Sequence, residues 1–186
     1  DISNRSTTVL KLKNNITLKS CLLCEENSYL YVISDIGRII KTKITEEIFP
    51  CMGKIAKGTN IMKLFPRENI IEAINIQEQQ IQDLILITNK GSFIKHNTKE
   101  IKTSQKGELG TIGINFKDNK KINDRVINCF INNKYVYIKT NKDRYEKLKK
   151  DQIDNSSYKK EKKLNLALND NEFIKSVFSI IVAEKN

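Results

Sequence analysis

The chain has 186 residues, of which 33 are Lys or Arg and 22 are Asp or Glu, so its formal net charge is +11 and its pI is about 9.4. This excess of positive charge favours a polyanionic partner, nucleic acid before a membrane surface. No apolar run approaches the ~20 residues needed to span a bilayer, so no membrane partner is expected. The sequence begins with Asp1, and we expect it to be a piece of a longer protein.

The sequence repeats itself at a spacing of 52 residues. Each copy has a small or polar start, an alternating apolar stretch, a polar turn and a second apolar stretch, and the copies begin at Ser6, Gly58, Gly110 and Lys162. A period of this length is typical of propellers, solenoids and other arrays. We therefore expect an array of similar units.

Three hairpin patterns lie between these stretches: LYVISDIGRIIKTK from Leu30, LILITNKGSFIKHN from Leu84 and YVYIKTNKDRYEKL from Tyr135. Gly37 and Gly91 supply the positive φ that such turns need, and the third pattern has Asp143 instead. The segments VLKL, NIMKL, IGINF, IIEAI and VINCF predict further strands, about four in each repeat. The prediction is an all-β, propeller-like fold of four-stranded blades, with about three to four blades in a single domain over residues 1–186.

Two further features carry predictions of their own. The stretch from Glu146 to Lys163 is highly charged and nearly free of apolar residues, so we expect a disordered insertion there. Cys21 and Cys24 form a C-x-x-C without a second pair at a zinc spacing, and His96 is the only histidine, so no metal site is expected. The four cysteines are expected to be reduced and buried in strands.

The order of these patterns resembles the C-terminal domain of the DNA gyrase A subunit. The segment GKIAKGTNIMKLFPRENIIEAI, from Gly53 to Ile74, is similar to that family's RxARGxPIVNLLPLxxGExI. The hairpins at Leu30 and Leu84 resemble LLFFTNRGRVYRLKVYEI and FMATKKGLVKRTPLxEF, and the copy from Gly110 resembles GIIAINLxxGDEL. The resemblance covers essentially the whole chain and weakens after Tyr135.

The resemblance implies a β-pinwheel, a propeller-like disc in which neighbouring blades exchange a strand and double-stranded DNA bends around a basic outer rim. It implies a non-catalytic domain of an ATP-dependent type II topoisomerase that introduces negative supercoils. The partner would be the gyrase B subunit in an A2B2 holoenzyme. ATP and magnesium would act elsewhere in that holoenzyme, with no cofactor and no catalytic residue in this piece. The implied compartment is a bacterial cytoplasm, or a plastid or other organelle of an AT-rich eukaryote.

Two departures from the family pattern stand out. The family's basic heptapeptide QRRGGRG falls on Asp1 to Ser6 and the residue before it; the sequence here is DISNRS, in which only Arg5 keeps a basic match. A closed disc of this family has about six blades, whereas the 52-residue period fits fewer than four times into this chain. Whether the disc closes, and whether the degenerate heptapeptide still wraps DNA, stay open at this point.

Cations recur at equivalent places in the repeats, as bending DNA without reading its sequence requires. The predicted DNA-binding residues follow the hairpins or lie in the loops equivalent to the heptapeptide: Arg5, Arg38, Lys41, Lys43, Lys54, Lys57, Lys90, Lys95, Lys99, Lys102 and Lys106. The third hairpin carries Lys142, Arg144 and Lys147 at the matching positions. The alternative interpretation is that polar outer strands need lysine to stay soluble.

Three functions follow from the sequence. The first is the DNA-wrapping domain of the gyrase A subunit, supported by the Gly53 to Ile74 segment. The second is the corresponding domain of the topoisomerase IV A subunit, which also has degenerate heptapeptides. The third is a propeller used for protein docking, in which the excess of lysine reflects an AT-rich coding sequence.

Overall fold

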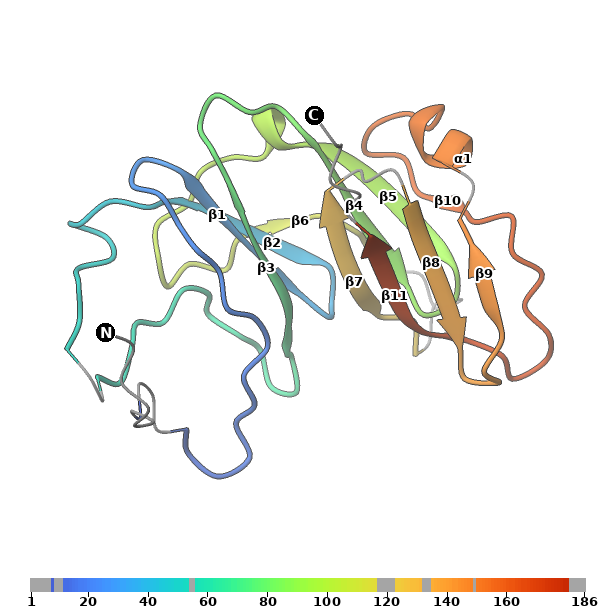
Figure 1. Cartoon of the computed structure of the whole chain (residues 1–186), viewed down its shortest axis with the longest axis horizontal. Coiled ribbons are helices and arrows are strands. Elements are labelled where there is room, and N and C mark those ends of the chain that lie inside the picture. Colours follow the sequence, from blue (N-terminus) through green and yellow to red (C-terminus); the bar gives the residue numbers. More distant parts are fainter. Residues whose placement is uncertain are drawn as a thin grey trace, which may run out of the picture.

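The computed structural model describes residue 8 and residues 12–53, 56–116, 123–131, 135–148 and 150–180. These residues form three antiparallel β-sheets, one short α-helix and one 3-10 turn, which confirms the predicted all-β fold (Figure 1). Within these ranges, no helix has the length and apolar character needed to cross a membrane.

The first sheet has the strand order β3-β1-β2-β6. β1 (Tyr29–Ser34) and β2 (Arg38–Lys43) form the first hairpin, and β3 (Ile70–Ile76) pairs with the other side of β1. β6 (Thr111–Ile112) belongs to the next repeat and pairs with β2, placing Ile112 opposite Arg38. The following repeat therefore donates the fourth strand of this sheet.

The second sheet has the equivalent order β10-β5-β4-β7. β4 (Asp83–Thr88) and β5 (Ser92–Asn97) form the hairpin, and β7 (Val126–Ile131) pairs with β4. β10 (Lys162–Lys163) comes from the third repeat and pairs with β5, placing Lys163 opposite Ser92. Strand donation thus occurs twice in the described part of the chain.

The third sheet has the order β11-β8-β9. β8 (Tyr135–Thr140) and β9 (Tyr145–Lys147) form the hairpin, and β11 (Ile174–Ile180) pairs with β8. Two short helical segments follow the second hairpin strand in two of the repeats: η1 (Thr98–Glu100) after β5, and α1 (Lys150–Asp154) after β9.

The hairpin turns adopt the positive φ that the sequence predicts. Gly37 has φ +80° and Gly91 has φ +77°, and Asp143 takes the same region with φ +56°. Aspartate tolerates this conformation better than most residues with a Cβ, because its short side chain forms local hydrogen bonds. The third hairpin therefore keeps the same turn with Asp143 in the place of the glycine.

The three sheets stack face to face, and side chains alternate between the two faces of each strand. Tyr31, Ile33 and Ile39 of the first sheet pack with Leu84 and Leu86 of the second. The opposite face of the second sheet, which includes Ile85, Ile87 and Phe93, packs with Val136, Ile138 and Ile174 of the third. Residues 84–87 are fully buried because the middle sheet is covered on both faces, as expected for a continuous apolar run.

Three expectations about elements need correction. NIMKL contributes only an isolated bridge from Met62 to Glu108. IGINF contributes only Ile112, the second residue of β6, because this segment crosses to the preceding sheet instead of adding a long strand to its own. Between residues 146 and 163, where we expected a disordered insertion, the described residues include α1 and β10. Leu148 and Ile153 anchor this stretch in the core beside the third sheet.

The cysteines also differ from the expectation. Only Cys129, in β7, is buried, and burial raises its pKa well above the ordinary value. Cys21, Cys24 and Cys51 are exposed and lie outside the strands.

Candidate nucleic-acid interface

Arg38 lies inside the first sheet and is paired with a buried carboxylate. Its Nε donates to Glu68 Oε1 at 2.9 Å, its second terminal nitrogen contacts Glu68 Oε2, and its guanidinium lies 4.4 Å from the Phe65 ring centroid. The remaining donors bind the carbonyl oxygens of Lys63 and Leu109. Four hydrogen bonds and the Phe65 ring hold this buried guanidinium, so its role is structural and it cannot form part of an outer rim.

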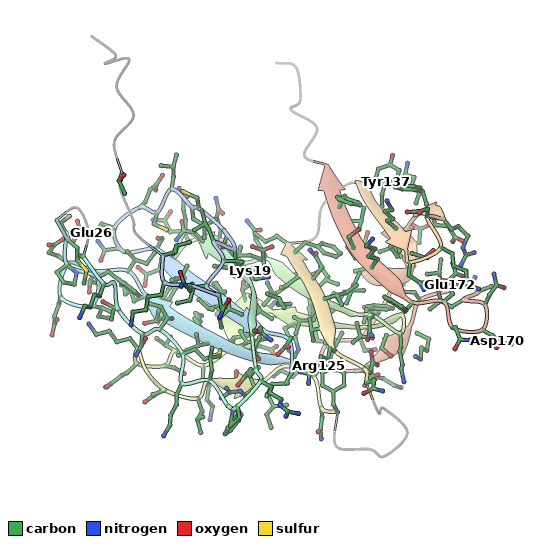
Figure 2. All side chains as sticks on the ribbon, turned by 90° about the horizontal axis from the view of Figure 1, so that it is seen from below. Lys19, Glu26, Arg125, Tyr137, Asp170 and Glu172 are labelled. Carbon is green, nitrogen blue, oxygen red and sulfur yellow. The ribbon has the colours of Figure 1, made fainter. Side chains whose placement is uncertain are left out.

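Burial would raise the pKa of Glu68, but hydrogen bonds from Arg38 and from the Phe65 N–H, together with the Arg38 charge, hold it below its ordinary value. The third repeat has the same arrangement. Arg144 Nε donates to Glu172 Oε1 at 3.0 Å, and the Asn169 N–H donates to Glu172 Oε2 at 3.0 Å (Glu172 is labelled in Figure 2). An Arg–Glu pair with a buried carboxylate therefore fastens the loop before β3 to the first hairpin turn and the loop before β11 to the third.

Lys41 and Lys95 are also buried, and they join neighbouring repeats. Lys41 Nζ donates to Thr98 O at 3.0 Å and lies 4.6 Å from the centroid of Tyr29. Lys95 Nζ donates to Asp154 O at 3.0 Å, at the end of α1, and lies 4.7 Å from the centroid of Tyr158. Burial lowers the pKa of Lys41. Both lysines bind carbonyl oxygens of the next repeat, so they are not available to a ligand on the surface.

The other predicted cations lie nearer the surface. Lys43 is half-buried and its Nζ is 3.1 Å from Glu78 Oε1. The exposed members of the set are Lys57, Lys90, Lys99, Lys102 and Lys106, and Lys106 Nζ donates to Ile48 O at 2.8 Å. Arg5 and Lys54 lie outside the described residues. The exposed cations fall on two different surfaces.

The first surface, which we call the turn edge, consists of the three hairpin turns and the loops that pack against them. It comprises residues 34–38, 63–69, 88–92, 123–125, 140–144 and 169–173, together with Lys163. Lys163 belongs to it because its Nζ donates to Lys90 O at 3.1 Å. Main-chain bonds hold each loop to its turn: the Asn69 O accepts from the Asp35 N–H at 2.9 Å, and the Arg125 O accepts from the Asn89 N–H at 3.0 Å. Arg125 also joins the first two sheets through an ion pair with Asp35 at 3.1 Å (Arg125 is labelled in Figure 2).

The turn edge is strongly basic. Its exposed cations are Lys63, Arg67, Lys90, Arg125, Lys142 and Lys163, against the exposed acids Asp143 and Asp170. The other acids of this edge, Asp35, Glu68, Asp124 and Glu172, are buried. Folding therefore removes acidic charge from this surface and leaves cations from all three repeats exposed on it.

The second surface consists of the loops that connect each hairpin to the donated strand, residues 44–58, 98–110 and 148–161, which we call the connecting loops. The exposed cations among their described side chains are Lys57, Lys99, Lys102, Lys106, Lys159 and Lys160. Equally many exposed acids accompany them: Glu46, Glu47, Glu100, Glu108, Asp151 and Asp154. Lys159 pairs with Glu100 at 2.7 Å, so much of this charge is compensated locally.

Among the predicted DNA-binding cations that lie in the described part of the chain, Lys90 is the one that is exposed on the turn edge. The predicted set does not include Lys63, Arg67, Arg125 and Lys163, because it is drawn from the hairpins and from the loops equivalent to the heptapeptide. Each repeat has a polar turn before its last strand, and the cations of these turns are visible in the sequence. That signal could have identified Arg67 and Arg125.

A family model described as "DNA gyrase C-terminal domain, beta-propeller" matches residues 28–76 and 82–133, which is more than half of the chain. The fold is similar to the C-terminal domain of DNA topoisomerase IV, with a TM-score of 0.78 and 17% identity over 93% of this chain and 53% of that chain. It is also similar to the E. coli ParC C-terminal domain, with a TM-score of 0.62 and 13% identity over 96% of this chain and 73% of that chain.

At these identities the structural similarities show the fold alone, and the chain spans about half the length of the topoisomerase IV domain. The search of curated proteins gives no match. The family model covers the first two hairpins and the strands that flank them, where the resemblance in sequence is also strongest. The chain belongs to the family of DNA gyrase C-terminal domains.

Proposed function

We propose that this domain binds and bends double-stranded DNA along the turn edge, as the C-terminal part of a gyrase-type A subunit that supports ATP-dependent negative supercoiling. This protein would act with the gyrase B subunit, and the ATP and magnesium sites would lie in other parts of that holoenzyme. The observation that supports this proposal most directly is the exposed positive charge of the turn edge, to which all three described repeats contribute.

Double-stranded DNA can bind to the turn edge through its phosphates, without contacts to the bases. Lysine and arginine neutralise phosphates and release condensed counterions, which makes the affinity strongly salt-dependent. Bending 20–30 base pairs costs on the order of 1–6 kcal/mol, so contacts must be distributed along the bend to offset that cost. An edge that runs across three stacked sheets supplies such a distribution.

The test compares two matched triple variants in binding to a 40-base-pair duplex over a range of salt concentrations. Lys63→Gln/Arg67→Gln/Lys90→Gln neutralises the turn edge, and Lys57→Gln/Lys99→Gln/Lys102→Gln removes the same charge from the connecting loops. We expect the turn-edge variant to bind more weakly, with its log–log salt slope reduced by about 0.9 for each phosphate that is no longer neutralised. Absence of duplex binding by the parent chain at low salt would contradict the function, and an equal effect of both triples would contradict its placement.

A second candidate is the corresponding domain of a topoisomerase IV A subunit. The sequence DISNRS at the position of the basic heptapeptide favours it, because gyrase wrapping in this family depends on that heptapeptide. The holoenzyme assay separates the two candidates. Negative supercoiling of relaxed plasmid supports the gyrase type, whereas relaxation and decatenation without supercoiling support the second.

A further inference from the structure

The loop before β3 presents three apolar residues on the turn edge, residues 64–66, which we call the apolar tip. Residues 63–67 read KLFPR and are all exposed, so the tip lies between Lys63 and Arg67. Leu64 is 42% exposed and Phe65 is 48% exposed. The other residues of the turn edge are polar, charged or glycine, apart from Ile36 and Phe173. Adjoining large apolar side chains on such a surface favour a ligand that has apolar surface of its own.

The structure holds Phe65 in one orientation. Its N–H donates to Glu68 Oε2 at 2.7 Å, and its carbonyl oxygen accepts from the Glu68 N–H at 3.1 Å. Pro66 fixes its own φ and Arg67 has φ +65°, which are the features of a type II turn. One side of the Phe65 ring contacts the guanidinium of Arg38, which is itself bonded to Glu68. A ligand at the tip therefore meets a side chain that loses little conformational entropy on binding.

The third repeat forms the same turn with polar residues. Asn169 and Asp170 stand in the places of Phe65 and Pro66 (Asp170 is labelled in Figure 2). The Asn169 N–H donates to Glu172 Oε2 at 3.0 Å, and the Glu172 N–H donates to Asn169 O at 2.9 Å. The turn therefore forms without apolar residues, so the fold does not require the apolar tip of the first repeat.

The surroundings of the tip match duplex DNA. Lys63 and Arg67 are exposed on either side of it, and the Glu68 carboxylate next to it is buried. The tip thus combines cations for phosphates with an apolar group between them. In duplex DNA the apolar surface between the phosphates is that of the sugars and the stacked bases. Proteins that bend DNA insert Phe, Leu or Pro side chains between base steps from the minor groove, which unstacks and kinks the duplex.

We propose that Phe65, with Leu64 and Pro66 beside it, acts as a wedge that enters the minor groove and partly unstacks one base step of the bound DNA. Resting on the proposed binding of DNA to the turn edge, the wedge adds a preferred position to that binding. Pyrimidine–purine steps such as TA are the easiest to unstack and kink. Bound DNA is therefore expected to place such a step at the loop before β3, although no base edge is read.

The test compares two duplexes of about 40 base pairs, long enough to be bent along the edge. One strand of the first duplex is entirely purine, so it contains no pyrimidine–purine step. The second has one central TA step in that strand, with 2-aminopurine in place of the adenine. We expect the parent chain to bind the TA duplex at least about threefold more tightly, and to raise the 2-aminopurine fluorescence at least about twofold as the base loses its stacking. Equal affinities, or an unchanged fluorescence, would overturn the wedge.

Phe65→Asn introduces the residue that the third repeat has at this position, and circular dichroism verifies that the variant is folded. We expect it to lose both the preference for the TA duplex and the rise in fluorescence. Energy transfer between dyes at the two ends of the duplex should report a smaller bend. Its log–log salt slope should equal that of the parent, because no cation is removed. Phe65→Leu keeps an apolar side chain and is expected to retain the preference.

The matched control is Phe173→Asn, which makes the same change at another exposed phenylalanine of the turn edge, 43% exposed. It is expected to behave like the parent, and a loss of the TA preference in this control but not in Phe65→Asn would overturn the placement of the wedge. Salt-dependent binding by the parent without a TA preference would overturn the wedge and leave the proposed DNA-binding function standing. Absence of binding at low salt would overturn both. If Phe65→Asn did not fold, the fluorescence measured with the parent chain would still decide.

Discussion

At the scale of single residues, the main finding is that the cations of the repeats serve two different purposes. Arg38, Lys41 and Lys95 are buried and bind carbonyl or carboxylate oxygens inside the array. Lys90 and Arg67 are exposed on the turn edge. A buried cation without its partner is costly, whereas an exposed one contributes little to stability.

Removing the Arg38 side chain tests this difference. Arg38→Ala leaves the Glu68 carboxylate buried without its partner, so we expect the free energy of unfolding to fall by about 3–5 kcal/mol. Arg67→Ala, on the exposed edge, is the control and is expected to change it by about 0.5 kcal/mol or less. Urea denaturation followed by circular dichroism measures both, and similar values for the two variants would contradict the structural role of Arg38.

His96 makes the stability depend on pH. Burial lowers the pKa of His96 below 6.5, although the hydrogen bond between its Nε2 and Gly113 O at 2.8 Å opposes this shift. Between the two pKa values the unfolded chain binds more protons than the folded one, so this contribution is complete above pH 6.5 and is lost as the pH falls towards the folded pKa.

We therefore expect the midpoint of urea denaturation to decrease from pH 7 to pH 5 by more in the parent chain than in His96→Gln. Carboxylates common to both chains cancel in this comparison. Because His96 is the only histidine, its ring resonances also give the folded pKa directly by NMR titration. An identical pH dependence in the two chains, or a folded pKa at or above 6.5, would show that burial does not control this group.

At the scale of elements, each hairpin depends on its turn, but the space around the turn differs between repeats. A Cβ at Gly37 would lie 2.2 Å from Ile114 Cγ2 and 2.8 Å from Ile114 O. A Cβ at Gly91 would lie no closer than 3.6 Å to its nearest neighbour, Leu168. Both glycines have a positive φ, but only Gly37 also lacks the space for a Cβ.

Substitution by asparagine separates the two effects, since asparagine tolerates a positive φ. Gly91→Asn is expected to cost less than about 1 kcal/mol, because Asp143 already occupies the equivalent position. Gly37→Asn is expected to cost at least about 2 kcal/mol more, because Ile114 and its backbone must move. Thermal unfolding measures the difference, and equal Tm values for the two variants would disprove the steric argument.

The sequence predicts the three hairpins, the strands β3 and β7 and the positive φ of Gly37, because these depend on local patterns. It does not predict which lysines are buried. Lys41 and Lys95 become buried only because the next repeat brings Thr98 O and Asp154 O to them. Nor does the sequence predict how short the donated strands β6 and β10 are, because their length depends on pairing with the preceding sheet. The turn edge was missed because its acids are buried by contacts between loops and turns that are distant in sequence.

At the scale of the whole molecule, the cations that stabilise the array are different from those that we propose bind DNA. Lys41 and Lys95 hold neighbouring repeats together, and the turn edge supplies the exposed charge. The double variant Lys41→Met/Lys95→Met retains the apolar part of each side chain but removes both hydrogen bonds to the next repeat.

We expect Lys41→Met/Lys95→Met to lower the free energy of unfolding by about 1–3 kcal/mol in total, because two hydrogen bonds from charged donors are lost while Thr98 O still accepts from the Tyr31 hydroxyl at 3.2 Å. The salt slope of duplex binding should stay the same, because neither ammonium group reaches the surface. Fluorescence anisotropy at a temperature where both chains are folded provides the measurement. A reduced slope would place these lysines in contact with DNA and contradict their assignment to the interior.

The donated strands have a consequence for how the protein is made. The hairpin β1–β2 leaves the ribosome long before Thr111 and Ile112, which complete its sheet, and β4–β5 must wait for Lys162 and Lys163. The first and second sheets can therefore close only after the hairpin of the next repeat has been synthesised. Maturation of the array lags translation by one repeat, and a ribosome that pauses within a connecting loop holds the preceding sheet one strand short.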